Sequence, residues 1–306
     1  MRGPTTTAVT LDSVANLTDA VRVLRGRRIL VLTGAGVSTD SGIPDYRGPD
    51  SPPRTPMMYA EFRSGEPARQ RYWARSHLGW RTLGRATPND GHRAIAALET
   101  DGHAFAVITQ NVDGLHQRAG SRSVVDLHGR ISDVRCLDCG DLSSRRDLRA
   151  RLDALNPGFG TDVEIETAPD GDAVFEAVHG FRIADCRACG GVLKPDVVFF
   201  GENVPKPKVE RCYTLVEAAD AVLVAGSSLT VLSGFRFARH AASRSIPVVI
   251  VNRGPTRADD LATVRVDAGC SQTLSRLAGA LRETGAHATG PGVRMAGPTG
   301  AVDAVG

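Results

Sequence analysis

The sequence predicts an α/β fold, with a Rossmann-like parallel sheet domain and a small zinc-binding domain. Short β-branched apolar runs, among them residues 28–33, 105–109 and 247–251, recur between stretches with helical spacing. Such runs are typical of parallel strands that are buried on both faces. Two Cys-x-x-Cys pairs, at residues 136–139 and 186–189, interrupt this alternation and indicate a separate unit held by a metal ion.

Composition and charge place the chain among soluble globular proteins. Its 306 residues are enough for one large domain and a small one, and 42% of them are apolar. The net charge is only +3 and the basic residues are scattered, so we expect no direct nucleic-acid binding. No stretch is long and apolar enough to span a membrane, and residues 1–7 lack the apolar core of a secretory signal. We therefore expect a cytoplasmic protein with no membrane partner.

The first motif follows the first buried strand. Residues 11–27 have the apolar spacing of a helix, residues 28–33 form the strand, and a turn with two glycines follows at residues 34–36. A helix that began near Val37 would point its free N–H groups at a diphosphate. Thr39 stands where the third glycine of the dinucleotide fingerprint would fall. From the turn alone, nucleotide binding and a plain tight turn both remain open.

A proline- and glycine-containing loop, residues 41–47, extends the turn and places Asp45 and Arg47 beside it. A minimal Rossmann turn does not need this loop, so it indicates a more specialised site. Residues 57–83 are predicted to be mostly helical, with a break near Gly65, and they carry most of the large aromatic side chains. Those side chains are predicted to lie in the core or to wall an apolar slot.

Polar side chains follow the next buried strand, 105–109, whose preceding helix is predicted to have Thr87 as N-cap and Pro88 at its first position. The carboxyl ends of parallel strands are where open α/β sheets bind ligands. The amide and carboxyl side chains there could bond a ribose or a carboxamide, and a capped turn with Asp113 as N-cap is the alternative. The polar residues are Gln110, Asn111 and Asp113.

A histidine–glycine pair, His128 and Gly129, follows a further strand that ends near Leu127. An isolated histidine is more often a structural residue than a catalytic one. The glycine leaves room around the ring, however, and a histidine whose pKa is near 6.5 can serve as a base at neutral pH. From this dipeptide alone, both readings remain open.

The four paired cysteines predict one structural zinc site. Each pair is followed by glycine, as in a zinc knuckle, and two pairs supply the four thiolates of a closed tetrahedral site. About 46 residues separate the pairs, which exceeds the usual 15–20, so an insertion at residues 142–183 must lie between the half-sites. A redox dithiol is the alternative. The expected ligands are Cys136, Cys139, Cys186 and Cys189.

The C-terminal half returns the chain to the main sheet. A strand is predicted at residues 197–200, followed by buried strands at 221–225 and 247–251 that end in polar turns, and by a short strand at 264–266. The final helix is predicted to begin at Cys270, with leucines on one face.

These motifs together resemble the sirtuins, the NAD-dependent protein lysine deacylases. The resemblance extends from about residue 26 to residue 281, and it is strongest to the class II branch of the family. It is carried by five motifs in the family's order: Gly-Ala-Gly-Val-Ser at 34–38, Gly-Ile-Pro-Asp-Tyr-Arg at 42–47, Thr-Gln-Asn-Val-Asp-Gly-Leu-His at 109–116, His-Gly at 128–129, and the paired cysteines.

The resemblance implies a cleft in which NAD meets an acyl-lysine of a protein substrate. His128 would be the general base and Asn111 a second catalytic residue. The implied substrate-binding segment comprises Val197, Val198, Phe199, Phe200, Gly201 and Glu202. The implied NAD contacts are Gly34, Ala35, Gly36, Ser38, Asp45, Tyr46, Arg47, Gln110, Asn111, Asp113, Gly226, Ser227, Ser228, Asn252, Arg253, Gly254 and Cys270.

The implied reaction yields nicotinamide, free lysine and O-acyl-ADP-ribose. A mono-ADP-ribosyltransferase and a non-catalytic NAD-binding module remain alternatives. Tyr72 and Arg75 have the spacing of a pair that selects acidic acyl groups in another branch, but we favour a neutral acyl chain. The predicted organisation is a flexible N-terminus (1–10), a discontinuous NAD-binding domain (11–130 and 191–284), a zinc module (131–190) and a disordered tail (285–306).

Overall fold

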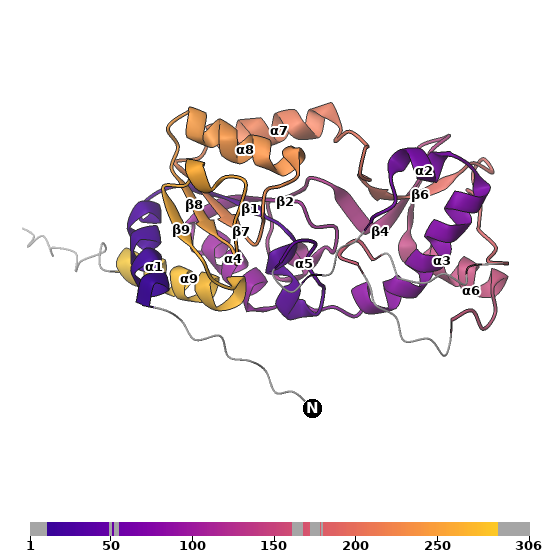
Figure 1. Ribbon diagram of the computed structural model, residues 1–306, viewed down its shortest axis with the longest axis horizontal. Coiled ribbons are helices and arrows are strands. Elements are labelled where there is room, and N and C mark those ends of the chain that lie inside the picture. The colour runs from indigo at the N-terminus through magenta and orange to yellow at the C-terminus, as the bar shows by residue number, and fades with distance from the viewer. Residues whose placement is uncertain are drawn as a thin grey trace, which may run out of the picture.

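The computed structural model describes residues 11–48, 51, 55–160, 168–171, 178 and 180–286. In this part of the chain, six parallel strands form one sheet in the order β3-β2-β1-β7-β8-β9 (Figure 1). The chain builds outward from β1 to one edge and then returns to β7 and builds to the other. The loops that leave β1 and β7 therefore meet at a topological switch point. The strands are β1 (Ile29–Thr33), β2 (Ala104–Thr109), β3 (Val124–Asp126), β7 (Ala221–Ala225), β8 (Val248–Val251) and β9 (Val264–Val266).

Helices cover both faces of this sheet (Figure 1). One face carries α1 (Leu11–Leu24), α4 (Asp90–Thr100) and α9 (Cys270–Ala286), and the other carries α7 (Lys206–Glu217) and α8 (Leu232–Ser243). Successive residues of β1 point to opposite faces of the sheet. Val31 therefore packs in the core under α1, α4 and α9, and Leu32 packs in the core under α7 and α8. Because both faces of the sheet are covered by apolar cores, these strands appear in the sequence as continuous hydrophobic runs. The predicted Rossmann-like fold is confirmed.

A second unit lies beside the main sheet (Figure 1). Its sheet has three antiparallel strands in the order β5-β4-β6, and its helices share one apolar core with them. Phe62, Trp73 and Leu148 are among the buried members of that core, as are the zinc-pair residues Cys136 and Cys186. The elements are β4 (Gly129–Cys136), β5 (Leu142–Ser144), β6 (Leu193–Val197), α2 (Tyr59–Arg63), α3 (Glu66–Leu83) and α6 (Arg145–Leu155).

The two units, as defined by their apolar cores, contain different parts of the chain from the predicted domains. The helices α2 and α3, and the strand β6, fall within the predicted Rossmann-like ranges 11–130 and 191–284, yet they pack with the small sheet. Residues 1–10 and 287–306 lie outside the described residues, and so do residues 161–167, 172–177 and 179 of the 142–183 insertion. The final helix extends to Ala286, two residues into the predicted tail.

Three local predictions were wrong in detail. No α-helix begins near Val37. Two short 3₁₀ turns, η1 (Ala35–Val37) and η2 (Thr39–Ser41), follow the glycine turn instead. The N-cap of α4 is Asn89, because its side chain accepts bonds from the backbone N–H groups of the first turn, so Thr87 and Pro88 lie before the helix.

The strand predicted at residues 197–200 is displaced toward the N-terminus. The observed strand, β6, ends at Val197, and Phe200 makes only an isolated bridge to Met58. Pairing along β4 fixes this register, since Gly129 lies opposite Val197. A Cβ atom on Gly129, at a φ of +82°, would lie 1.9 Å from the Asp196 carbonyl oxygen, so only glycine allows this close approach.

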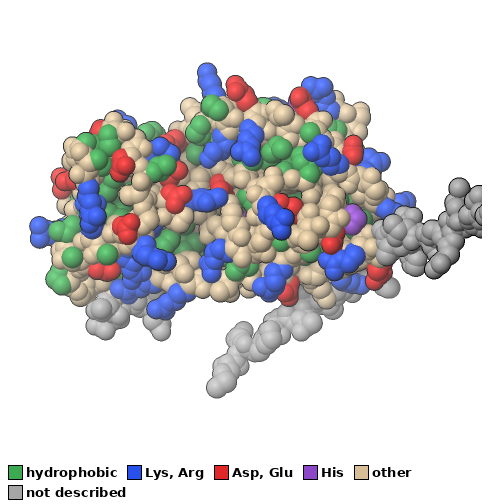
Figure 2. Space-filling model, turned by 180° about the vertical axis from the view of Figure 1, so that it is seen from behind, with side chains coloured by type: hydrophobic (Ala, Val, Ile, Leu, Met, Phe, Trp, Pro, Cys, Tyr) green, Lys and Arg blue, Asp and Glu red, His purple; other side chains and the backbone are tan. Residues whose placement is uncertain are grey.

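Surface charges of both signs are interspersed over the described residues on the face that Figure 2 shows. None of the described helices is long and apolar enough to cross a membrane. Two further elements connect the layers or lie near the site: α5 (Leu115–Arg118) and η3 (Asp259–Leu261).

Candidate active site

A cleft of about 540 Å³ opens where the switch point of the main sheet faces the small unit. It collects loops that follow β1, β2, β6 and β7, as expected if strand ends share one edge. Gly254 and Cys270 do not line it. The predicted site residues that do are Gly34, Ala35, Gly36, Ser38, Asp45, Tyr46, Arg47, Gln110, Asn111, Asp113, His128, Val197, Val198, Phe199, Phe200, Gly201, Glu202, Gly226, Ser227, Ser228, Asn252 and Arg253.

Two glycine turns form the cradle at the switch point. The amide of Gly36 donates to the carbonyl oxygen of Gly226 at 2.8 Å, which holds the two turns together. Gly226 has a φ of +59°, and a Cβ atom there would lie 2.3 Å from the Val37 nitrogen and 3.0 Å from the Cys270 sulfur. Glycine is therefore required at Gly226. Cys270 supports the turn from beneath rather than contacting the cleft.

Ser38 organises the polar floor of the cleft. Its hydroxyl donates to Asp113 Oδ2 at 2.7 Å and accepts from Asn111 Nδ2 at 3.1 Å. The amide of Asn111 also donates to the Gly34 carbonyl oxygen at 3.1 Å. Because both amide hydrogens are used inside the protein, Asn111 offers its acceptor oxygen to a ligand.

Two buried histidines lie beneath this floor. His92 Nε2 is 3.4 Å from the Ser38 hydroxyl, whose hydrogen already goes to Asp113, so His92 donates. His116 Nε2 lies 2.9 Å from Thr33 Oγ1. Burial lowers the pKa of His92 to about 4 and that of His116 to about 3, so both rings are neutral at physiological pH.

The pKa of Asp113 is raised, in contrast to the lowered pKa values of the two histidines. Burial raises the pKa of its carboxyl group, while bonds from Ser38 and from the Leu115 amide, at 2.9 Å, work against that rise. The predicted alternative, Asp113 as N-cap, was wrong, because the N-cap of α5 is Gly114. The Leu115 bond instead ties Asp113 to the turn that precedes the helix. Asp113 also lines the cleft, which is where the ligand-binding reading requires it to be.

The imidazole of His128 is bonded at both nitrogens. Nδ1 is 2.9 Å from the Gln110 carbonyl oxygen, and Nε2 is 2.8 Å from the hydroxyl of Ser233. A carbonyl can only accept, so Nδ1 carries the ring hydrogen and Nε2 holds the lone pair that faces Ser233. Burial, opposed by the Gln110 bond and assisted by Lys208, lowers the pKa of His128 to about 4. The expected pKa near 6.5 is therefore corrected downward.

The two loops that flank the cleft are held by their own acidic residues. Asp45 accepts bonds from the amides of Arg47, at 3.1 Å, and Gly48, at 2.5 Å, so it shapes the predicted cofactor loop. Glu202 accepts from the Phe199 amide at 2.9 Å and pairs with Lys194. Both carboxylates are committed to loop structure as well as lining the cleft.

Besides Pro169 and Asp170 of the insertion, the sequence prediction missed two parts of the cleft wall. The first is the start of α8, including Ser233 and Arg236, which directly follows the predicted Gly226 turn. The second consists of Met57 and Val112, which pack in the same core as Tyr72 and form with it an apolar end of the cleft. An aromatic wall of such a slot is one of the two readings predicted for residues 57–83. Of the aromatics in residues 57–83, Tyr72 alone lines the cleft among the described residues, and its large neighbours pack in the small-unit core.

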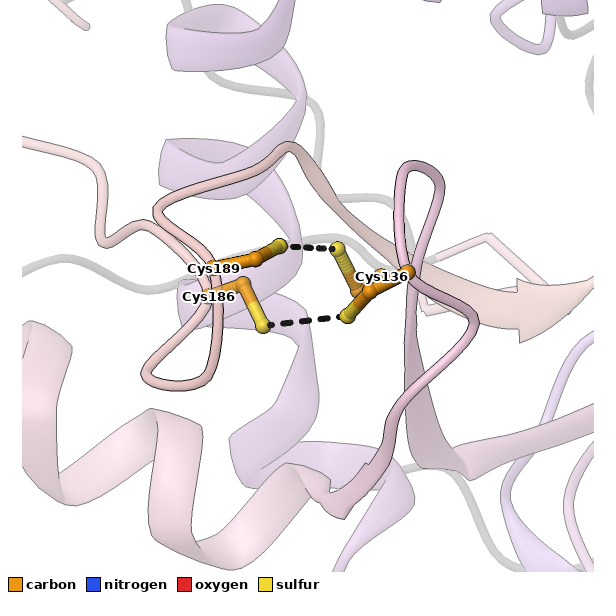
Figure 3. A group of neighbouring side chains, drawn as sticks. Cys136, Cys186 and Cys189 are labelled. Carbon is orange, nitrogen blue, oxygen red and sulfur yellow. Dashed lines mark hydrogen bonds between the residues drawn. The ribbon is translucent and has the colours of Figure 1, made fainter.

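The four paired cysteines converge in the small unit, and their sulfur atoms all lie within 4.8 Å of one another. The Cys136 and Cys189 sulfurs are 3.6 Å apart, and the Cys139 and Cys186 sulfurs are 3.8 Å apart (Figure 3). Tetrahedral zinc with bonds of about 2.3 Å places sulfurs about 3.8 Å apart, so this cluster fits one zinc ion. It has no open ligand position for catalysis.

Backbone donors also suit bound thiolates. The amides of Asp138 and Cys139 point at the Cys136 sulfur, and the Gly191 amide points at the Cys189 sulfur. Such donors stabilise negative charge on sulfur. The cluster therefore belongs to the structure of the small unit.

Comparison with known proteins identifies the family. A model of the Sir2 family matches residues 34–233, more than half of the chain. The chain belongs to the Sir2 family. The Sir2 match ends at Ser233, so it contains both glycine turns of the cleft and all four cysteines.

Sir2 relatives resemble the chain over most of its length. A protein of Mycobacterium avium (strain 104) named NAD-dependent protein deacetylase 1 is 58% identical over 274 residues, 88% of this chain and 97% of the relative. A protein of the same name from Streptomyces coelicolor is 55% identical over 86% of this chain and 89% of the relative. A Sir2 protein solved with a p53 peptide and NAD⁺ superimposes with a TM-score of 0.71 at 30% identity, covering 88% of this chain and 99% of that one.

Proposed function

We propose that this Sir2-family protein is an NAD-dependent protein lysine deacylase that transfers the acyl group to ADP-ribose. The observation that carries this proposal is the position of His128. It presents an unprotonated Nε2 to the same cleft that holds the glycine cradle and the apolar end. The names of the Mycobacterium and Streptomyces relatives support the same activity.

The residues of the cleft fit NAD. The turns at Gly34 and Gly226 pack so closely on each other that neither glycine could carry a side chain. Both turns line the cleft, where their backbone N–H groups would suit a diphosphate. Asn111 offers an acceptor oxygen that suits a carboxamide, and Asn252 lines the far end of the cleft. When bound, NAD would supply a ribosyl carbon as acceptor for the acyl group and nicotinamide as the leaving group.

His128 would then take a proton at Nε2. Its low pKa keeps the ring neutral and able to accept at any physiological pH. The Gln110 carbonyl fixes the tautomer and can continue to accept from Nδ1–H after the ring becomes charged. On the cleft floor, the side chains of Asn111 and Asp113 are held in place by their bonds to Ser38.

The apolar end suggests which acyl groups are accepted. Met57, Val112 and Tyr72 line it, while Arg75 does not line the cleft although it follows Tyr72 by one helical turn. A neutral acyl chain is the better partner for such a wall, because an acidic acyl group would lose water without gaining this cation. The segment 197–202 borders the same end and would hold the substrate peptide by backbone bonds.

Mass spectrometry of the purified protein with NAD and acyl-lysine peptides tests the proposal. Acetyl, long neutral and succinyl peptides are compared, with His128→Ala as the control. The expected result is NAD-dependent loss of neutral acyl groups together with O-acyl-ADP-ribose, and loss of both in the variant. Faster removal of succinyl than of every neutral group would contradict the proposed acyl class.

The same experiment separates the alternative functions. Gain of ADP-ribose on a protein, with no deacylated peptide, would indicate a mono-ADP-ribosyltransferase. Binding of NAD with neither product would indicate a non-catalytic module. Cytoplasmic location and membership of the class II branch are part of the proposal, and cell fractionation tests the first of these.

A further inference from the structure

We propose that Ser233 is a positioning residue for the base His128, an inference that rests on the proposed function. Ser233 is the second residue of α8, and its hydroxyl lies 2.8 Å from Nε2. Because Nδ1 carries the ring hydrogen, Ser233 must donate to Nε2 in the resting protein. The serine therefore holds the atom that accepts the proton.

The contact depends on a close approach of α8 to the loop after β2. Gly234, the residue after Ser233, lies against Gln110, and a Cβ atom there would be 2.3 Å from the Gln110 Oε1. The Gln110 side chain is itself fixed, since its Nε2 donates to Ser227 Oγ at 2.8 Å and to the Thr33 carbonyl at 3.2 Å. The close packing of Gly234 against the Gln110 side chain therefore brings Ser233 beside the ring whose Nδ1 bonds the Gln110 carbonyl.

A hydroxyl can partner Nε2 in both of its protonation states. Before reaction Ser233 donates to the lone pair. When His128 takes a proton from a substrate hydroxyl, that O–H bond breaks, its electron pair stays on the oxygen, and an N–H bond forms at Nε2. Because Nε2 has a single lone pair, Ser233 turns its hydrogen away as the substrate proton arrives, and its oxygen then accepts from the new N–H. Bonds to the charged ring are the stronger ones, so the serine favours the protonated state.

Neighbouring hydroxyls do not share this role. Ser228 and Thr230 also line the cleft, but their hydroxyls bond each other at 3.1 Å. Among the described residues, Ser233 is the side chain that contacts the base nitrogen of His128.

Three variants test the role: Ser233→Ala, Ser233→Thr, and the matched control Ser243→Ala at the other end of α8. The Ser243 hydroxyl donates to the His240 carbonyl in the same helix. We expect Ser233→Ala to lower kcat roughly 10- to 100-fold, with less than about a threefold change in KM for NAD. Ser233→Thr keeps the hydroxyl and should stay within about threefold of the parent, and Ser243→Ala should match it.

The outcomes separate clearly. A kcat of Ser233→Ala equal to that of the parent would overturn the proposal. Equal losses in the alanine and threonine variants would show that shape matters rather than the hydroxyl. A raised KM for NAD at constant kcat would assign Ser233 to substrate binding. Each of the last two results also overturns a positioning role.

A measurement on the NAD-free protein keeps this proposal distinct from the proposed function. The ¹⁵N chemical shifts of the His128 ring report the tautomer and the bond at Nε2. We expect the Nε2 signal to move in Ser233→Ala and to stay in place in Ser243→Ala, even if no peptide is deacylated. An unchanged Nε2 signal in Ser233→Ala would contradict the role of Ser233 and would leave the proposed deacylase activity untouched.

Discussion

Lys194 and Glu202 form an ion pair, with Lys194 Nζ 3.0 Å from Glu202 Oε2, directly behind the segment predicted to bind the substrate peptide. Lys194 is buried, and its ammonium also donates to the Val197 carbonyl oxygen at 2.5 Å and lies 4.8 Å from the Phe199 ring. Burial lowers the pKa of Lys194, and Glu202 acts against that shift. The pair thus closes the loop that follows β6.

Lys194→Met should loosen this loop and leave Glu202 without its cation. We expect a loss of stability of about 3 kcal/mol, the usual result of removing one partner of a buried pair. We also expect KM for the acyl peptide to rise about tenfold, with KM for NAD unchanged, since the loop lies at the peptide end. Chemical denaturation and steady-state kinetics measure both effects.

Adding Glu202→Gln to Lys194→Met should recover part of the loss. The double variant no longer carries an unpaired carboxylate, so the two single effects should not add. Additive free energies of unfolding would show that the pair does not couple and that the loop is held by its other contacts.

Gly226→Ala should abolish the cradle at the switch point. The new Cβ atom would lie 2.3 Å from the Val37 nitrogen, at a φ of +59°, so the turn must open or the fold must strain. We expect NAD binding, measured by calorimetry, to weaken by at least about tenfold, a loss near 1.4 kcal/mol.

Gly279→Ala is the matched control for this substitution. Gly279 lies within α9, and a Cβ atom there meets nothing within 4 Å. Alanine is the better helix former, so this variant should gain about 0.5–1 kcal/mol of stability and keep its NAD affinity. Equal NAD affinity in Gly226→Ala and Gly279→Ala would remove Gly226 from the cofactor site.

The local chemistry of the site could be predicted from sequence because parallel strands bring their carboxyl ends to one edge. Asn111, His128 and Ser227 each follow a strand, so their shared cleft follows from strand order. The contact between Ser233 and His128 could not be predicted in that way. It depends on how α8 docks against Gln110, a contact between segments far apart in the chain.

The other differences between the sequence predictions and the structure also arise from contacts between segments that are far apart in the chain or from burial. The helix α3 belongs with the small sheet because Trp73 donates to the Leu193 carbonyl at 3.2 Å and packs in that core, which no local pattern shows. Burial sets the pKa of His128, and the sequence pattern alone gave only its ordinary value. The N-cap at Asn89 replaced Thr87 because its amide also reaches the Val37 carbonyl, at 2.7 Å.

Stability should fall as pH decreases from about 6.5 toward 4. Burial lowers the pKa of His77, His92 and His128 to about 4 and that of His116 to about 3. In this range the unfolded chain binds protons that the folded protein excludes, so acid favours unfolding, by up to on the order of 3 kcal/mol for each ring. Asp113 acts in the opposite sense, because its raised pKa lets the folded state bind a proton first.

Urea denaturation between pH 7.5 and 5 measures this slope. His77 lies in the small unit, where Nε2 is 3.1 Å from Asp153 Oδ1, so it can be changed without touching the cleft. His77→Asn should reduce proton uptake on unfolding by about one. A free energy of unfolding that does not change between pH 7.5 and 5 would show that these rings are not held neutral.

Zinc removal should unfold the small unit and, with it, one wall of the cleft. The cysteine cluster shares its core with Trp73, Leu193 and Val197, and Val197 also lines the cleft. We expect one zinc per chain by elemental analysis, and a strong chelator should lower both Tm and activity together. Cys139→Ser should lose the metal. Cys212→Ala, at a residue of α7 that faces the core of the main sheet, should keep it despite some loss of stability. Full zinc content in Cys139→Ser, or full activity in the zinc-free protein, would contradict a structural zinc that supports the cleft.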